Sequence, residues 1–164
     1  MHDLANPLNS SNVLNLASRI AQNSNSYPDL TADHYLQLRQ QELFMELTQK
    51  LQISLEIDKI ITMLLEQLRK LVPVDGITYQ YGPLNFEFSS PVQGRHKTSY
   101  QLDLEKEDLG LISFSRRTRF KDVELTCIEN LMSCLLYPLR NGLKYHSALI
   151  AASTDPLTGA GNRT

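Results

Sequence analysis

Residues 108–115 read Asp-Leu-Gly-Leu-Ile-Ser-Phe-Ser, and residues 120–124 read Phe-Lys-Asp-Val-Glu after a short basic segment. Within the first stretch, Ile112 and Phe114 alternate with their neighbours, which is the pattern of a strand with one buried face. From residue 121 to 153, apolar residues recur at three- and four-residue steps, which predicts a helix. The sequence here therefore predicts the last strand of a sheet, followed by a long C-terminal helix.

Three more segments upstream show the alternation of β-strands, at residues 77–81, 86–88 and 100–104. Gly82-Pro83 marks a hairpin turn, and residues 105–108 form a polar turn before the last strand. Short links between successive strands favour antiparallel pairing, because parallel strands need a long crossover connection. We therefore expect an antiparallel sheet.

Two amphipathic helices are expected before the first strand, over residues 31–52 and 57–72, and Pro73 ends the second. Pro138 lies inside the predicted C-terminal helix and should kink it. Residues 141–153 carry few apolar side chains for a core, so we expect them to project as a stalk. The predicted fold class is α+β, an antiparallel sheet flanked by helices with a long C-terminal helix.

Composition narrows the class of protein. The chain has 164 residues, 41% of them hydrophobic, which suits one domain with extensions. A net charge of −2 gives no general attraction to nucleic acid or to an anionic membrane. No apolar run has the length of a membrane span, and the N-terminus lacks the features of a signal peptide. We expect a cytoplasmic protein with neither nucleic acid nor membrane among its partners.

The two cysteines and the N-terminal residues give further expectations. Cys127 and Cys134 are seven residues apart in a helical pattern, roughly 10 Å along the axis, so they cannot bridge each other. No metal site is expected, because no further ligands lie near them in the sequence. Residues 1–30 are rich in Asn, Ser and Pro and predict a loosely attached arm, with a possible short helix over residues 13–21.

The last ten residues are Asp155-Pro156-Leu157-Thr158-Gly159-Ala160-Gly161-Asn162-Arg163-Thr164. They resemble the opening signature of the GGDEF family, the diguanylate cyclase domain of bacteria, which reads roughly D-x-L-T-G-L-x-N-R. The matching residues are Asp155, Leu157, Thr158, Gly159, Asn162 and Arg163, and Ala160 replaces a usual Leu. Pro156 lacks an N–H and restricts the residue before it, so the upstream helix should end at about Thr154.

Residues 33–150 resemble a GAF domain in the order of their elements and in the stretch 108–115 with its continuation at 120–124. Sensor folds of the PAS type are the main competitor, and the two helices before the first strand favour GAF. GAF domains that bind ligands usually roof the pocket with a long excursion between early and late strands. Here only residues 91–97 make that link, so we expect no enclosed ligand site and no cofactor in this chain.

These resemblances imply a division of the chain and a function. Residues 31–140 would form a minimal GAF domain, 141–154 a signalling helix, and 155–164 the start of a truncated GGDEF domain. The intact protein would condense two GTP molecules into cyclic di-GMP with Mg²⁺, as a homodimer, because each cyclase domain presents one GTP to the other. This chain alone would have no catalytic residues and would bind GTP only through the missing domain. The alternative is a GAF domain that senses a small molecule and is coupled to a degenerate GGDEF domain.

Two sets of residues are candidates for binding. The apolar stripes of the first and last long helices predict a dimer and signalling interface, formed by Leu36, Leu43, Leu47, Ile128, Leu135, Leu139, Leu143 and Ile150. Arg95-His96-Lys97 and Arg116-Arg117-Thr118-Arg119 are basic clusters on predicted loops. They could meet and hold an anion, or they could form an ordinary solvated face.

Overall fold

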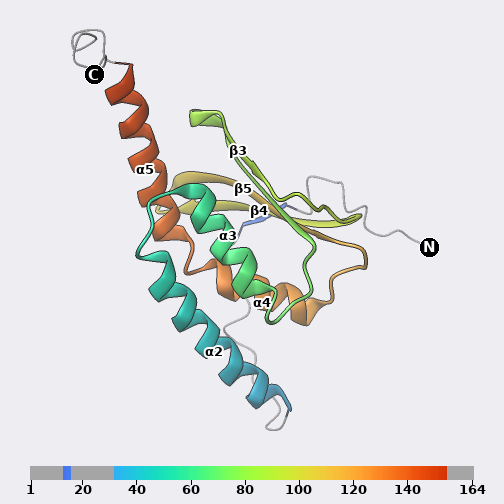
Figure 1. Ribbon diagram of the computed structural model, residues 1–164. Coiled ribbons are helices and arrows are strands. Elements are labelled where there is room, and N and C mark those ends of the chain that lie inside the picture. The colour runs from blue at the N-terminus through green and yellow to red at the C-terminus, as the bar shows by residue number, and fades with distance from the viewer. Residues whose placement is uncertain (1–12, 16–31, 155–164) are drawn as a thin grey trace.

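A computed structural model describes residues 13–15 and 32–154 (Figure 1). Four strands form an antiparallel sheet: β2 (Gly76–Tyr81), β3 (Phe86–Ser89), β4 (His96–Leu104) and β5 (Glu107–Arg116). Four helices accompany it: α2 (Ala32–Leu51), α3 (Ile57–Leu68), α4 (Asp122–Met132) and α5 (Leu136–Ser153). The predicted α+β class and the antiparallel sheet are confirmed.

The strand order is β1-β4-β5-β2-β3, where β1 is the short segment Val13–Asn15 at the edge of the sheet. It pairs in parallel with β4, opposite Ser99, Tyr100 and Gln101. The short helix expected over residues 13–21 is therefore wrong for Val13–Asn15. A free strand edge offers N–H and C=O groups that an extended segment satisfies and a helix does not. The other residues of the N-terminal arm lie outside the described residues.

The hairpin between β4 and β5 is tighter than the sequence indicated. Only Glu105 and Lys106 form the loop, both at positive φ (52° and 69°), and Glu107 and Asp108 already belong to β5. Positive φ at both central residues matches the twist of the flanking strands, which is why two-residue hairpins use it. Gly110, at φ 97°, lies near a register shift between Leu102 and Asp103, where a side chain would collide with the Gln80 carbonyl oxygen.

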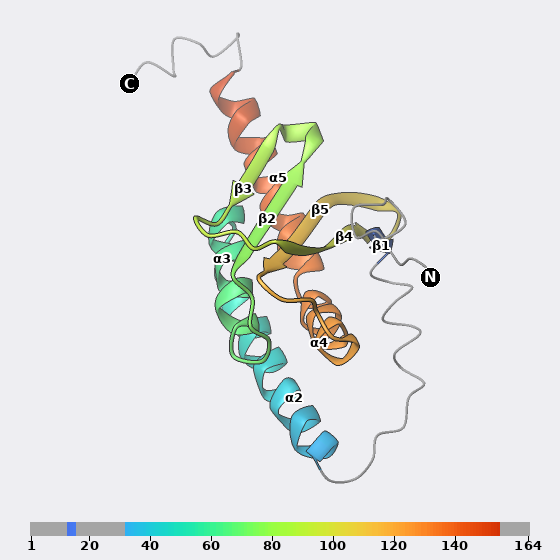
Figure 2. The same ribbon diagram turned by 90° about the vertical axis from the view of Figure 1, so that its right-hand side faces the viewer.

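The helices cover one face of the sheet in layers (Figures 1 and 2). α3 contacts β2, and α5 contacts β4 and β5, whereas α2 lies outside them against α3 and α4. The strand side chains that face the helices are fully buried and form the centre of the core, namely Ile77, Tyr79, Tyr100, Ile112 and Phe114. Outward-facing neighbours such as Thr78 and Ser113 are only half-buried, so the sheet has one dry face.

The single C-terminal helix predicted over residues 121–153 is wrong, because α4 and α5 are separate helices. Pro138 supplies the physical reason: it has no N–H for the Cys134 carbonyl, and its ring would clash with that carbonyl in a continuous helix. The chain instead makes tight turns, with Leu135 N–H bonded to the Met132 oxygen at 2.9 Å. Pro138 then lies in the first turn of α5, where a missing N–H costs little.

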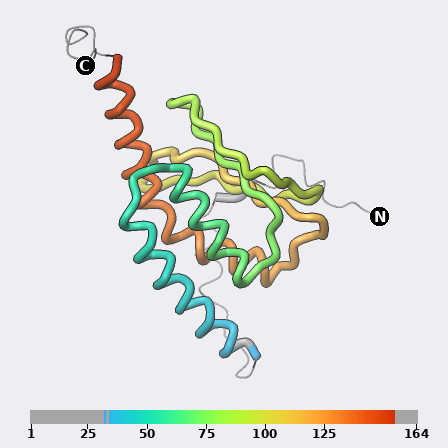
Figure 3. Tube along the Cα trace, viewed as in Figure 1, coloured from blue at the N-terminus to red at the C-terminus, as the bar shows by residue number. Residues whose placement is uncertain are grey.

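α5 leaves the body of the domain after its first half (Figure 3). Its buried residues are Leu139, Gly142 and Leu143, and from Ser147 to Ser153 every residue is exposed. The Thr154 N–H closes the helix on the Ile150 oxygen at 3.1 Å. Among the helices of residues 32–154, none combines the length and the apolar character that crossing a membrane would require.

Candidate functional surface

The residues predicted to form the dimer interface divide into two groups. Six of the eight are at most 4% exposed and belong to the hydrophobic core of this one chain: Leu43, Leu47, Ile128, Leu135, Leu139 and Leu143. A second copy could not reach them without opening the core, so their assignment to an interface is corrected. Leu36 is half-buried, and Ile150 is 40% exposed on the projecting part of α5.

A different set of apolar side chains is exposed. Among residues 32–154, ten of the twelve large exposed hydrophobic residues lie on α2, on the α2–α3 loop or on α5: Tyr35, Leu38, Phe44, Met45, Ile53, Leu55, Tyr137, Tyr145, Leu149 and Ile150. The other two, Val92 and Val123, lie elsewhere. We call the ten residues the helical edge. Exposed apolar residues that gather on a few elements indicate an interaction surface more than scattered ones do.

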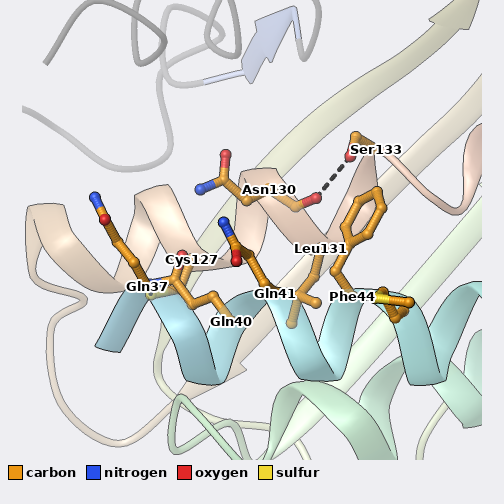
Figure 4. Close-up of a pocket in the computed structure, with 9 residues that line it drawn as sticks. Gln37, Gln40, Gln41, Phe44, Cys127, Asn130, Leu131 and Ser133 are labelled. Atoms are coloured by element: carbon orange, nitrogen blue, oxygen red, sulfur yellow. Dashed lines mark hydrogen bonds between the residues drawn. The ribbon is translucent and has the colours of Figure 1, made fainter. Parts of the chain in front are cut away.

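A groove between α2 and α4 forms one part of this surface (Figure 4). Its lining is mixed, with apolar groups beside side-chain amides: Gln37, Gln40, Gln41, Phe44 and Met45 from α2, and Cys127, Asn130, Leu131 and Ser133 from α4 and the following turn. The Gln40 amide donates to the Cys127 sulfur at 2.9 Å, and the Ser133 hydroxyl donates to the Asn130 carbonyl at 2.7 Å. Such a lining suits another protein segment, since apolar groups provide contact area and amides adapt their hydrogen bonds.

The groove continues along the molecule. Phe44 and Ser133 also line a second groove, which runs between the end of α2 and the start of α5 past Leu55 and Tyr137. Leu55 also lines a third groove, together with Ile53, Tyr145 of α5 and mostly polar residues of α3. The three grooves share lining residues from α2 to α5, and six residues of the helical edge line them: Phe44, Met45, Ile53, Leu55, Tyr137 and Tyr145.

The two cysteine thiols face this surface but are poor nucleophiles. Burial raises the pKa of Cys127, and it raises the pKa of Cys134 to about 11. The Cys134 thiol also donates to the Leu131 carbonyl oxygen at 2.8 Å. Both thiols therefore stay protonated at neutral pH, and only a thiolate reacts readily. Their place is in the packing between α2 and α4 rather than in chemistry.

The two basic clusters do meet, because His96 pairs with Arg116 where β4 begins and β5 ends. Arg116 is only 5% exposed and forms an ion pair with Glu124 of α4, at 3.0 Å from Nη1 to Oε1. Nη2 also donates to Glu124 Oε2, and the three other N–H groups donate to the carbonyl oxygens of Pro73, Thr118 and Arg119. All five donors of the guanidinium are thereby used, so Arg116 holds its own loop and leaves nothing for an anion.

The Arg116–Glu124 pair is supported from two sides. The guanidinium lies 4.4 Å from the centre of the Phe120 ring, a favourable cation–π distance. Glu124 also accepts the Lys121 backbone N–H at 2.8 Å, at the start of α4. The hydrogen bond from Arg116 is the main cause that holds the pKa of Glu124 below its usual value. Pairing with Arg116 therefore favours the carboxylate form of Glu124.

The link expected at residues 91–97 covers residues 90–95 in the structure, because His96 and Lys97 belong to β4. It is fixed tightly across the same end of the sheet. The Gly94 N–H bonds to the Ser115 hydroxyl at 2.8 Å, and that hydroxyl donates to the Gln93 side chain at 3.0 Å. A side chain at Gly94 would lie 2.2 Å from the Arg116 backbone, and one at Gly76 would lie 2.1 Å from the Val92 oxygen. The link therefore packs directly on the strand ends.

The predicted GGDEF opening motif, from Asp155 to Arg163, lies outside the described residues. Within residues 13–15 and 32–154, no three His, Cys, Asp or Glu side chains gather as metal ligands would. No protein-family model matches the chain, and no curated protein matches it. The sequence analysis did not identify three residues of this surface, Phe44, Met45 and Tyr137. Each is a large apolar residue that lies outside the buried stripe of its helix, and this position could have indicated an exposed apolar surface.

Proposed function

We propose that this chain is the regulatory module of a diguanylate cyclase, a GAF-like domain that joins two copies and passes a signal through α5. The intact protein would condense two GTP molecules into cyclic di-GMP. One observation carries the proposal: six residues that match the GGDEF opening signature begin at Asp155, two positions after α5 ends at Ser153. We assign GTP and Mg²⁺ to the cyclase domain that would open there, and no ligand to the GAF-like domain.

The anchoring of α5 supports a role in transmission. Leu139 and Leu143 are buried in the core, and Gly142 lets α5 approach α3, since a Cβ there would lie 3.2 Å from both Ile60 Cδ1 and the Leu55 oxygen. A helix held this closely moves with the body of its domain. Its exposed half would carry that displacement to Asp155.

The arrangement of α2 and α5 supports a parallel homodimer. In Figures 1 and 3, α2 rises along one side of the molecule, and α5 takes over from it and continues beyond the domain. A two-fold axis along this side would bring the two helical edges together and the two α5 ends to the same end of the dimer. That geometry suits a cyclase in which each of two domains presents one GTP to the other.

The short link at residues 91–97 supports a GAF-like domain that transmits rather than encloses a ligand. Ligand-binding members of that family cover the sheet with a long excursion at this place. Here the link is held on the strand ends through Gly94 and Ser115, as described above. The two helices directly before β2, α2 and α3, agree with the GAF order of elements, in which a helical pair precedes the antiparallel strands.

The activity is tested with the natural full-length protein and with residues 1–164, each incubated with GTP and Mg²⁺. We expect cyclic di-GMP from the full-length protein and none from residues 1–164. A full-length protein that makes no product but binds cyclic di-GMP would replace this proposal with that of a degenerate cyclase domain. Product from residues 1–164 alone would contradict it outright.

The interface is tested by one exposed substitution on the helical edge and one off it. Met45→Glu places a charge on the edge, where Met45 is 63% exposed, and Val123→Glu places the same charge at a site that is 53% exposed. Sedimentation should show a dimer for the unmodified chain and for Val123→Glu, and a shift towards monomer for Met45→Glu. A dimer that persists in Met45→Glu, or a monomeric unmodified chain, would contradict the interface while leaving the cyclase assignment open to the first test.

A further inference from the structure

Unpaired cations are concentrated at one end of the sheet. Among the fourteen Lys and Arg residues that the structure describes, seven make no ion pair and no hydrogen bond through their charged groups. Five of these seven are Arg95, Lys97, Arg117, Arg119 and Lys121, and the other two are Lys106 and Lys144. We call the five residues the basic end. They come from the start of β4 and from the loop between β5 and α4, which lie together in Figure 2.

The buried Arg116–Glu124 pair gives the basic end a fixed frame. Arg116 donates to the carbonyl oxygens of Thr118 and Arg119, so it ties down the loop that carries Arg117 and Arg119. The Arg117 N–H bonds to the Asp75 carboxylate at 3.0 Å, which fixes the loop from its other side. A buried ion pair is weak evidence for stability, because desolvation offsets its attraction, and its best-attested use is to specify an arrangement. Here the Arg116–Glu124 pair fixes the loop that carries the exposed side chains of Arg117 and Arg119.

The charge of this surface is opposite to that of the whole chain. All five cationic side chains are exposed, and the nearby carboxylates free of Arg116 are Asp75 and Asp122. The chain as a whole carries a net charge of −2. A concentrated positive surface on an acidic protein steers and orients a negatively charged partner.

We propose that the basic end is a docking surface for an acidic protein surface, one that presents a cluster of Asp and Glu side chains. Three of the five cations are arginines, whose planar donors match carboxylates in pairs. Such a contact would use the sheet end, leaving the helical edge free. The proposal is independent of the cyclase function.

Three observations favour carboxylates over the phosphates of a nucleic acid. The Arg116 guanidinium occupies one face of the Phe120 ring, so a base could not stack on that face. The first turn of α4 already holds Asp122 and Glu124, which occupy the positive end of that helix. The acidic side chains elsewhere on the chain would also repel a long polyanion, whereas a compact acidic cluster would contact the basic end alone.

The test uses residues 1–164 with two fluorescent probes of equal charge, an oligo-glutamate peptide and a short DNA duplex. Binding is followed by fluorescence anisotropy at low and high salt. We expect the peptide to bind more tightly than the duplex, with an affinity that falls as salt rises. Arg117→Glu combined with Arg119→Glu should weaken peptide binding at least about tenfold, as expected when like charges are placed opposite each other.

The matched control is Lys106→Glu combined with Lys144→Glu, which changes the net charge equally at the two unpaired cations outside the basic end. It should keep the affinity for the peptide within about twofold, because these residues lie away from the contact. Arg95→Glu combined with Lys97→Glu, at the start of β4, should cause the same loss of peptide affinity as the double substitution in the loop. Circular dichroism verifies that each variant is folded. Equal losses in both kinds of variant, no binding of the peptide, or tighter binding of the duplex would each overturn the proposal.

Discussion

Two regions of this protein depart from the usual distribution of side chains, in opposite directions. At the end of the sheet the charged Arg116 is 5% exposed, whereas along the helical edge Met45 and Ile53 are 63% and 83% exposed. A buried charge and a concentrated exposed apolar surface are the informative exceptions in a folded protein. The first has every donor satisfied within the chain. Met45 and Ile53 are left uncovered by the part of the chain that the structure describes.

The difference teaches how to interpret each exception. A buried charge that is fully satisfied has completed its role inside the fold, which here is to hold the loop of residues 117–121 against α4. Apolar side chains at the surface stabilise a complex only when a partner covers them. Each Å² of apolar area that is buried then contributes about 25 cal/mol. The Arg116–Glu124 pair is therefore complete within the chain, and the helical edge is where burial of apolar area by a second molecule would contribute most.

Breaking the buried pair should have the largest effect. Glu124→Ala leaves the Arg116 guanidinium buried without its carboxylate, and removing one partner of a buried pair costs about 3–5 kcal/mol. Denaturant unfolding measures that loss in the free energy of unfolding. Glu87→Ala is the control, because Glu87 is exposed and bonds only to Gln80, so it should change stability by less than about 0.5 kcal/mol.

A loss below about 1 kcal/mol in Glu124→Ala, the size of a single surface interaction, would contradict the comparison. It would mean that Arg116 is satisfied by the three carbonyl oxygens alone and that Glu124 is dispensable. Phe120→Leu separates the two contributions, since it removes the ring under the guanidinium but keeps the pair.

The second prediction divides α5 itself into a core half and a surface half. Leu143 is 4% exposed and Ile150 is 40% exposed, although both were expected to share one apolar stripe. Leu143→Ala should cost about 2–5 kcal/mol of stability, as large-to-small changes in a core do. Ile150→Ala should cost less than about 0.5 kcal/mol in the monomer.

Dimerisation sharpens this second prediction. If Ile150 contacts a second copy, Ile150→Ala should weaken association while leaving monomer stability unchanged, and sedimentation over a range of concentrations would detect it. Equal losses of monomer stability at both positions would show that the outer half of α5 packs on this chain, against its exposure.

Local signals in the sequence predicted most of the fold. Alternation located the four antiparallel strands, and Pro73 and the leucine stripes located the helices near α2 and α3. The break between α4 and α5 was missed because Pro138 was expected to kink a helix, whereas its missing N–H and its ring separate two helices. The strand at Val13–Asn15 was missed because its pairing with β4 is a contact between distant parts of the chain.

The candidate surface was harder to predict than the fold. Leu43 and Leu47 look the same in the sequence whether they pack in their own core or against a partner, because both give a helical apolar stripe. Only the arrangement of α2 over α3 and α4 decides that they are internal. Arg116 was assigned to a basic cluster because its partner, Glu124, comes within reach only after the chain turns into α4.

The last prediction has the smallest expected effect in free energy and concerns the intact protein. One residue inserted after Ala148, in the exposed half of α5, rotates everything beyond it by about 100°, and four residues nearly restore the phase at 3.6 residues per turn. If α5 couples the domain to a cyclase, one added residue should lower cyclic di-GMP production several-fold or lock it on, and four should partly restore regulation. Neither insertion should change the denaturant stability of residues 1–164, because Ala148 lies beyond the buried contacts of α5. A stability loss would show that the outer half is part of the fold. Cyclase activity that does not depend on insertion length would show that α5 is a passive tether. The exposed side chains of α5 would then have no part in passing a signal to the cyclase domain.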